Sequence, residues 1–203
     1  MAKKGSMLRV GKNFLKGMVV LTNVAIIIGS LRKESVSRKI AKNVAKYFPE
    51  GFNAEIVEIG DLPMYNQDFD DHNEVPESYT IFRNRMKEKQ AVLFITPEYN
   101  RSIPGVLKNA LDVGSRPYGS SIWDGKPAAI ISHSIGNLSG FGANHHLRQC
   151  LVFLNMPTMA QPEAYLANSA NLLGAEGNIQ NPDTEKFLQN FVDRFVDWIR
   201  RFT

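Results

Sequence analysis

Five short apolar runs, each followed by a segment with a different pattern, constrain this chain more than any other feature. The predicted strands are residues 23–28, 54–59, 91–96, 128–132 and roughly 158–165. Most of them are apolar at successive positions and not at every second one, which indicates strands that are covered on both faces. Strands of this kind that alternate with helices predict an α/β fold, with a parallel sheet between two layers of helices.

Helical periodicity is clear in two of the intervening segments. Val36, Ile40, Val44 and Phe48 recur every four residues, and residues 187–202 carry a broad apolar stripe. In parallel sheets, ligands bind beyond the carboxyl ends of the strands, where the strand order reverses. The loops that directly follow the strands are therefore the segments where we expect ligand-binding residues.

The positive charge of the chain is concentrated at its beginning. Residues 1–17 contain five lysines and arginines and no acidic residue, so removing them from the net charge of +4 leaves −1. We expect residues 1–17 to be a basic tail and residues 18–203 to form a single domain. Scattered basic residues without a reading motif predict no nucleic-acid binding.

Two further features bear on where the protein works. The apolar stretch after the tail is too short for a membrane span and lacks a signal-peptide cleavage site, so we expect no membrane association. Cys150 is the single cysteine of the chain, which excludes an internal disulfide. A reducing, cytoplasmic location is the expectation that follows.

The loop after the first predicted strand, GSLRKESVS, combines a helix start with hydroxyl groups and a guanidinium. Ser35 stands where the helical pattern begins and is a candidate cap. The amino terminus of a helix favours an anion, and Ser30, Arg32 and Ser37 add donors beside it. This pattern predicts a phosphate site, the alternative being that Ser35 only caps the helix and Arg32 is solvated.

Familiar glycine-rich nucleotide loops are absent from the chain. No GxGxxG follows the first strand, and the stretch from Gly119 to Lys126 has the wrong spacing for a P-loop, with Pro127 where Ser or Thr would hold Mg²⁺. A mononucleotide held by hydroxyl groups is therefore favoured over a dinucleotide or an ATP–Mg²⁺ complex.

Two more loops carry ligand-binding patterns. Pro97-Glu98-Tyr99-Asn100 follows the third strand, and a proline turn with an aromatic and an amide suits a flat ring, although it is also compatible with a structural turn that buries Tyr99. The loop after the fourth strand is rich in glycine and serine, which allows close approach of its backbone to a ligand. His133 at its start is expected to be a hydrogen-bonded packing residue.

The motifs GSLRKES and, some sixty residues later, PEYN with the following PG and LKNA resemble those of the NAD(P)H-dependent FMN reductase family. This flavodoxin-like group includes chromate, quinone and azo-dye reductases. The resemblance covers roughly residues 20–170 and implies a flavodoxin-like three-layer sandwich. Its five-stranded parallel sheet would have the order 2-1-3-4-5, with non-covalent FMN where that order reverses.

The resemblance also assigns binding residues, position by position. The cofactor-binding set that it implies is Ser30, Leu31, Arg32, Ser35, Val36 and Ser37 for the phosphate, Pro97, Glu98, Tyr99 and Asn100 for the ring, and Ser134 with Gly136 as a third contact. The chain departs from the family pattern at Val36 and Val113, where aromatic residues are common. These departures leave the substrate preference open.

The activity that the resemblance implies is transfer of hydride from NAD(P)H through FMN to a quinone, azo, nitroaromatic or metal-oxyanion acceptor. Because the flavin carries the chemistry, we assign no catalytic side chain. The family implies a homodimer or a homotetramer. The alternatives are an FMN-binding electron carrier, a reductase that supplies reduced FMN to a monooxygenase, and an interaction protein that has lost the cofactor.

Several conspicuous residues are expected to lie outside this chemistry. Neighbours such as His145 and His146 point in different directions on a helix, so we expect no metal site. The acidic cluster at residues 68–74 is expected to be a solvated loop. Tyr118 and Trp123, which flank a Gly/Ser-rich loop, are expected to contact substrate or a neighbouring subunit.

Overall fold

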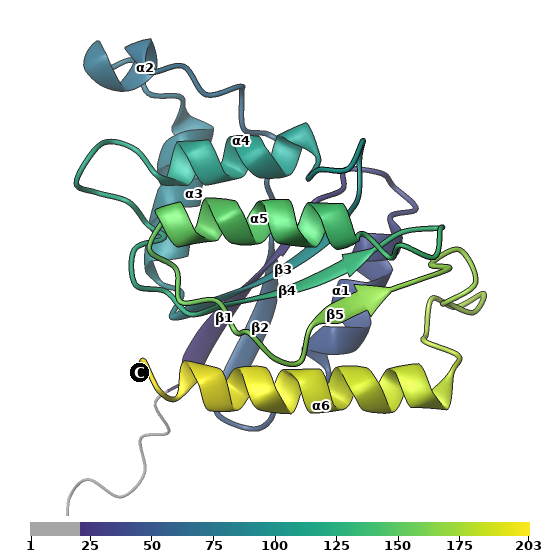
Figure 1. Ribbon diagram of the computed structural model, residues 1–203. Coiled ribbons are helices and arrows are strands. Elements are labelled where there is room, and N and C mark those ends of the chain that lie inside the picture. The colour runs from purple at the N-terminus through teal and green to yellow at the C-terminus, as the bar shows by residue number, and fades with distance from the viewer. Residues whose placement is uncertain (1–20) are drawn as a thin grey trace, which may run out of the picture.

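A five-stranded parallel sheet forms the centre of the protein in the computed structural model, which describes residues 21–203 (Figure 1). In sheet order the strands are β2 (Phe52–Val57), β1 (Thr22–Ile28), β3 (Ala91–Pro97), β4 (Ala128–His133) and β5 (Ala164–Leu166). This order confirms the 2-1-3-4-5 prediction, and it reverses between β1 and β3. The basic tail expected at residues 1–17 lies outside the described residues.

Helices cover both faces of the sheet, which completes the predicted three-layer sandwich. One face carries α1 (Val36–Ala45) and α6 (Pro182–Ile199), and the other carries α3 (Glu77–Lys87), α4 (Gly105–Gly114) and α5 (Phe141–Phe153) (Figure 1). The short α2 (Asp68–Asp71) precedes α3. Among the helices of residues 21–203, none combines the length and the apolar run that a bilayer crossing requires.

Successive side chains of the central strands point into two separate cores. In β1, Ala25 and Ile27 pack against α3, α4 and α5, whereas Val24, Ile26 and Ile28 pack against α1 and α6. All five are buried. The continuous apolar runs in the sequence therefore reflect strands that are buried on both faces.

β5 is shorter than the sequence predicted, with three residues in place of a strand beginning near residue 158. Thr158 makes only an isolated bridge to Ala128, and the chain then passes Pro162 before pairing with β4. Proline has no amide hydrogen to donate to a neighbouring strand. The regular ladder consequently starts only at Ala164.

The acidic cluster differs from the solvated loop that was expected. Residues 68–71 form α2, and Asp70 makes a two-bond ion pair with Arg83 of α3, at 2.8 and 3.0 Å, with both side chains at most 10% exposed. Arg83 also donates from Nε to the carbonyl of Val113. One acid of this cluster therefore fastens α2 to the α3–α4 layer.

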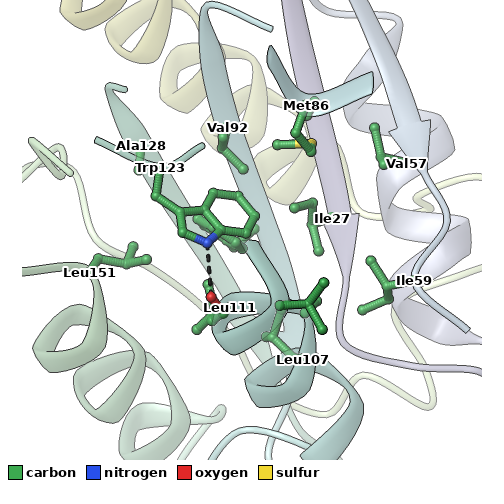
Figure 2. Close-up of a cluster of buried hydrophobic side chains, with 14 of the residues drawn as sticks. Ile27, Val57, Ile59, Met86, Val92, Leu107, Leu111, Trp123, Ala128 and Leu151 are labelled. Carbon is green, nitrogen blue, oxygen red and sulfur yellow. Dashed lines mark hydrogen bonds between the residues drawn. The ribbon is translucent and has the colours of Figure 1, made fainter. Parts of the chain in front are cut away.

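Trp123 lies inside the core, so the expectation that it contacts substrate or a second subunit is wrong. The indole is fully buried, and its ring centroid lies 6.1 Å from that of Phe82 and 6.2 Å from that of Phe94. Its Nε1 donates to the carbonyl of Leu111 at 2.9 Å (Figure 2). Tyr118, by contrast, is 81% exposed. The indole fits because the last residue of α4, Gly114, has no side chain and lies against the ring.

Substituting that glycine should destabilise the protein. A Cβ at Gly114 would lie 2.5–2.7 Å from three atoms of the Trp123 ring, whereas a Cβ at Gly105 of the same helix would meet nothing within 4 Å. We expect Gly114→Ala to lower the free energy of unfolding by about 1–3 kcal/mol, because the core is overpacked. Gly105→Ala is the matched control, expected to be neutral or slightly stabilising. Equal urea midpoints for the two variants would contradict this account.

Candidate functional site

A pocket of about 200 Å³ lies beyond the carboxyl ends of β1, β3 and β4, where the three predicted loops meet. Of the residues that the sequence assigned to a site, those lining the pocket are Ser30, Arg32, Val36, Ser37, Pro97, Glu98, Tyr99 and Ser134. Leu31, Ser35, Asn100 and Gly136 belong to the same loops but do not line it. The structure thus brings together parts of the chain that are more than a hundred residues apart.

A larger hollow of about 660 Å³ lies elsewhere, between α1 and residues 175–178. Its walls include Lys39 and Lys42 of α1, the C-cap Lys46 and two residues of the edge strand β2. Of the loop after β1, only Glu34 lines this hollow. Because ligands of parallel sheets bind beyond the carboxyl ends of the strands, where the strand order reverses, the smaller pocket is favoured as the functional site.

The first loop presents the amino terminus of α1 to the pocket. Ser35 is the N-cap, and its Oγ accepts a hydrogen bond from the amide of Arg38 at 3.2 Å. This confirms that Ser35 caps the helix. The amides of Val36 and Ser37, in the first turn, have no acceptor among residues 21–203 and remain available to an anion.

A glycine is required at position 29, at the end of β1, because there is no room for a side chain, and not because the backbone has a positive φ. A Cβ there would lie 2.6 Å from Oγ1 of Thr96 on the neighbouring β3. The amide of Gly29 donates to the carbonyl of Ile95 at 2.9 Å. The first and second loops therefore leave the sheet in close contact.

The second loop is a tight hairpin held at its base. The backbones of Tyr99 and Ser102 exchange two hydrogen bonds of 2.9 Å, and Asn100 and Arg101 at the tip have φ of 50° and 65°. Two left-handed residues at a hairpin tip are typical of a type I′ turn. Tyr99 is 51% exposed, so the alternative of a turn that buries this ring is wrong.

Glu98 ties the second loop to the third. Its side chain is 7% exposed, and Oε2 accepts from the amide of Ala143 in the first turn of α5, at 3.1 Å. Its other oxygen accepts from Arg101 at 2.8 Å. A carboxylate at this position caps the helix and complements its dipole. Both oxygens are engaged within the protein, which leaves Glu98 little capacity to contact a ligand.

His133 links the first loop to the segment after β5. Its Nε2 lies 2.7 Å from Oγ of Ser37, and its Nδ1 lies 3.2 Å from Oγ of Ser169. Burial lowers the pKa of His133 to about 4, so the imidazole is neutral at physiological pH. This agrees with the expectation of a hydrogen-bonded packing residue.

Three pocket residues were not assigned to the site from the sequence: His133, Ile135 and Ser169. Ile135 and His133 flank Ser134, which was assigned. Ser169 follows β5, so the rule about carboxyl ends, applied to the fifth strand, would have found it. Its amide donates to the carbonyl of Ser134 at 3.0 Å, which places both loops on the same wall.

The side chains of the pocket fit FMN. One end offers the hydroxyls of Ser30 and Ser37, the Arg32 guanidinium and the free amides of α1, a donor set suited to a phosphate. The other end offers the half-exposed ring of Tyr99 beside Pro97, flat apolar surfaces suited to an isoalloxazine. Glu98 is the one carboxylate lining the pocket, and both of its oxygens are occupied.

The buried His133 predicts that the flavin-free protein loses stability in acid. Between pH 6.5 and about 4 the unfolded chain binds a proton at this histidine and the folded chain does not. The contribution of His133 to the free energy of unfolding is therefore complete above pH 6.5. It is lost as the pH decreases toward 4 and below, by about 3 kcal/mol in total. Urea titrations at pH 7 and pH 4.5 measure the loss. A His133→Gln variant, lacking the titrating ring, should lose less over the same interval, and an equal loss would contradict the assignment.

Comparison with known proteins places the chain in a family. The model of the NADPH-dependent FMN reductase family matches residues 22–171. A quinone reductase of Pseudomonas putida is 54% identical over 178 residues, which cover 88% of this chain and 95% of that protein. A 2-hydroxy-1,4-benzoquinone reductase of a Burkholderia species is 43% identical over 177 residues, covering 87% and 96% of the two chains.

Solved structures agree with this assignment. FerB, a flavoenzyme NAD(P)H:(acceptor) oxidoreductase from Paracoccus denitrificans, has a TM-score of 0.83 at 42% identity and covers 90% of this chain and 99% of its own. A flavodoxin from Pseudomonas aeruginosa, with a TM-score of 0.55 at 17% identity and coverage of 88% and 99%, shares the fold alone. The protein described here therefore belongs to the NADPH-dependent FMN reductase family and is an oxidoreductase that uses FMN and NAD(P)H.

Proposed function

We propose that this oxidoreductase is a quinone reductase. The observation that carries the proposal is the pocket at the β1/β3 switch point, with a donor-rich end and an aromatic end. The relatives named as quinone reductases, at 54% and 43% identity over most of the chain, support a quinone as the acceptor. Azo, nitroaromatic and metal-oxyanion acceptors are further members of the proposed substrate range.

The proposed binding residues divide between two ends of the cofactor. Ser30, Arg32, Ser37 and the first amides of α1 hold the phosphate, while Leu31, Ser35 and Val36 shape the loop that carries them. Pro97, Tyr99 and Asn100 position the ring, Glu98 fixes their loop against α5, and Ser134 with Gly136 supplies the third contact. Bound FMN supplies the redox chemistry, accepting hydride from NAD(P)H and passing electrons to the acceptor.

We also propose that the protein works as a homodimer or homotetramer in the cytoplasm. Beside the pocket, the third loop and the start of α5 expose three apolar side chains: Ile135 at 80%, Leu138 at 59% and Phe141 at 52%. A second copy of the chain would cover this apolar surface and give an open ring site a further wall. The one cysteine of the chain suits the reducing cytoplasm. Residues 1–17 are proposed to be a tail to the single domain at residues 18–203.

Reduction of the bound flavin by a pyridine nucleotide tests the proposed function. We expect the purified protein, loaded with FMN, to lose its visible flavin absorbance promptly when NADPH or NADH is added without oxygen. Addition of a benzoquinone should restore the absorbance within the mixing time.

Each other outcome points to a different function. A bound flavin that neither nucleotide reduces would indicate an electron carrier. Reduced FMN that separates from the protein on a desalting column, with slow quinone turnover, would indicate a supplier of reduced flavin to a monooxygenase. Failure to bind FMN at all would overturn the proposal.

Arg32 tests the assignment of the phosphate end. Arg32→Ala should weaken FMN binding about 10- to 100-fold, because a charge-assisted contact is lost, and should leave riboflavin binding nearly unchanged. Lys42→Ala removes the same charge from the exposed side of α1, outside the pocket, and should alter neither affinity. Flavin fluorescence titrations measure both. Equal losses for FMN and riboflavin would exclude a phosphate role for Arg32.

A further inference from the structure

Ser37, His133 and Ser169 form a chain of buried polar side chains under the donor-rich end of the pocket. They come from α1, the end of β4 and the segment after β5, and are exposed by only 1%, 5% and 2%. All three line the pocket. The imidazole stands between the two hydroxyls, with Nε2 toward Ser37 and Nδ1 toward Ser169.

The chemistry of a neutral imidazole restricts how this chain can be hydrogen-bonded. One ring nitrogen donates and the other accepts. One serine must therefore give its hydroxyl hydrogen to the ring, and the other must accept the ring hydrogen. The accepting serine keeps its own hydroxyl hydrogen for another partner. The tautomer of His133 thus decides whether Ser37 or Ser169 has a hydrogen to offer a ligand in the pocket.

The position of Ser37 decides between the two arrangements. Ser37 lies in the first turn of α1, where unpaired amides and the helix dipole favour an anion. An anion bound there attracts the hydroxyl hydrogen of Ser37 and so favours the arrangement in which His133 Nε2–H donates to Ser37 Oγ. Ser169 then donates its hydroxyl hydrogen to Nδ1.

We propose that His133 is a positioning residue for the cofactor phosphate, which acts by directing the hydroxyl hydrogen of Ser37 into the pocket. Ser169 fixes the ring in the Nε2–H tautomer that this task requires. The imidazole itself does not reach the phosphate in this arrangement, because each ring nitrogen already has a serine partner. This inference rests on the proposed function, since it takes the phosphate of FMN as the ligand.

A matched pair of substitutions separates the two ring nitrogens. The side-chain nitrogen of Gln can take the place of Nε2, and that of Asn can take the place of Nδ1. His133→Gln keeps a donor to Ser37 and should leave the FMN dissociation constant within about threefold of wild type. His133→Asn loses it and should weaken FMN about tenfold, the loss expected for one neutral hydrogen bond. Riboflavin, which lacks the phosphate, should bind all three proteins alike.

A double-mutant cycle shows whether His133 acts through Ser37. Ser37→Ala should weaken FMN at least as much as His133→Asn, and adding His133→Asn to Ser37→Ala should have no further effect. Additive losses would overturn the proposal, as would an unchanged ratio of FMN to riboflavin affinity in His133→Asn. If wild type binds FMN normally in those cases, the proposed function stands and only the role of His133 fails. If wild type binds no FMN, both fail.

Nitrogen-15 NMR reads the tautomer in the wild-type protein itself, so the result does not depend on how a variant folds, and a variant serves only to assign the signals. The imidazole nitrogens of His133 report the tautomer directly, and His133→Gln identifies their signals among the four histidines of the chain. We expect the Nε2–H tautomer in the FMN complex. An Nδ1–H tautomer in that complex would overturn the proposal, because Ser37 would then be donating to the ring.

Discussion

Close pairing of β1 with β3 is the constraint on which the site depends. The two strands run side by side in the middle of the sheet, and the chain leaves them toward opposite faces, to α1 and to α4. A crevice at their carboxyl ends is the unavoidable result. Gly29 and Thr96 lie so close that no side chain can stand between the two exits. The pocket residues of the first two loops leave the sheet at this junction, and residues from the ends of β4 and β5 complete the lining.

A few buried polar contacts connect the loops around the crevice to one another. Glu98 joins the hairpin to the first turn of α5, and His133 joins α1 to the segment after β5. Each contact spans two loops that are far apart in the sequence. Unpaired buried polar groups are costly, so these contacts strongly favour one arrangement of the loops.

Much of this architecture could be predicted from the sequence because its signals are local. Apolar runs identified the buried strands, and Ser35 marked the start of α1. The partners of Ser37 and Glu98 could not be predicted, since they lie 96 and 45 residues away and only the fold brings them together. Trp123 was misjudged because its burial depends on the missing side chain of Gly114, and β5 because Pro162 interrupts its pairing.

The residues that line the pocket differ in how deeply they are buried. At the donor-rich end of the pocket, Ser37, His133 and Ser169 are buried between three elements, whereas Tyr99 and Ile135 elsewhere in its lining are exposed. Substitutions at those exposed positions leave the buried contacts intact. The opening of the pocket can therefore change in shape and polarity while the buried contacts at its base stay the same.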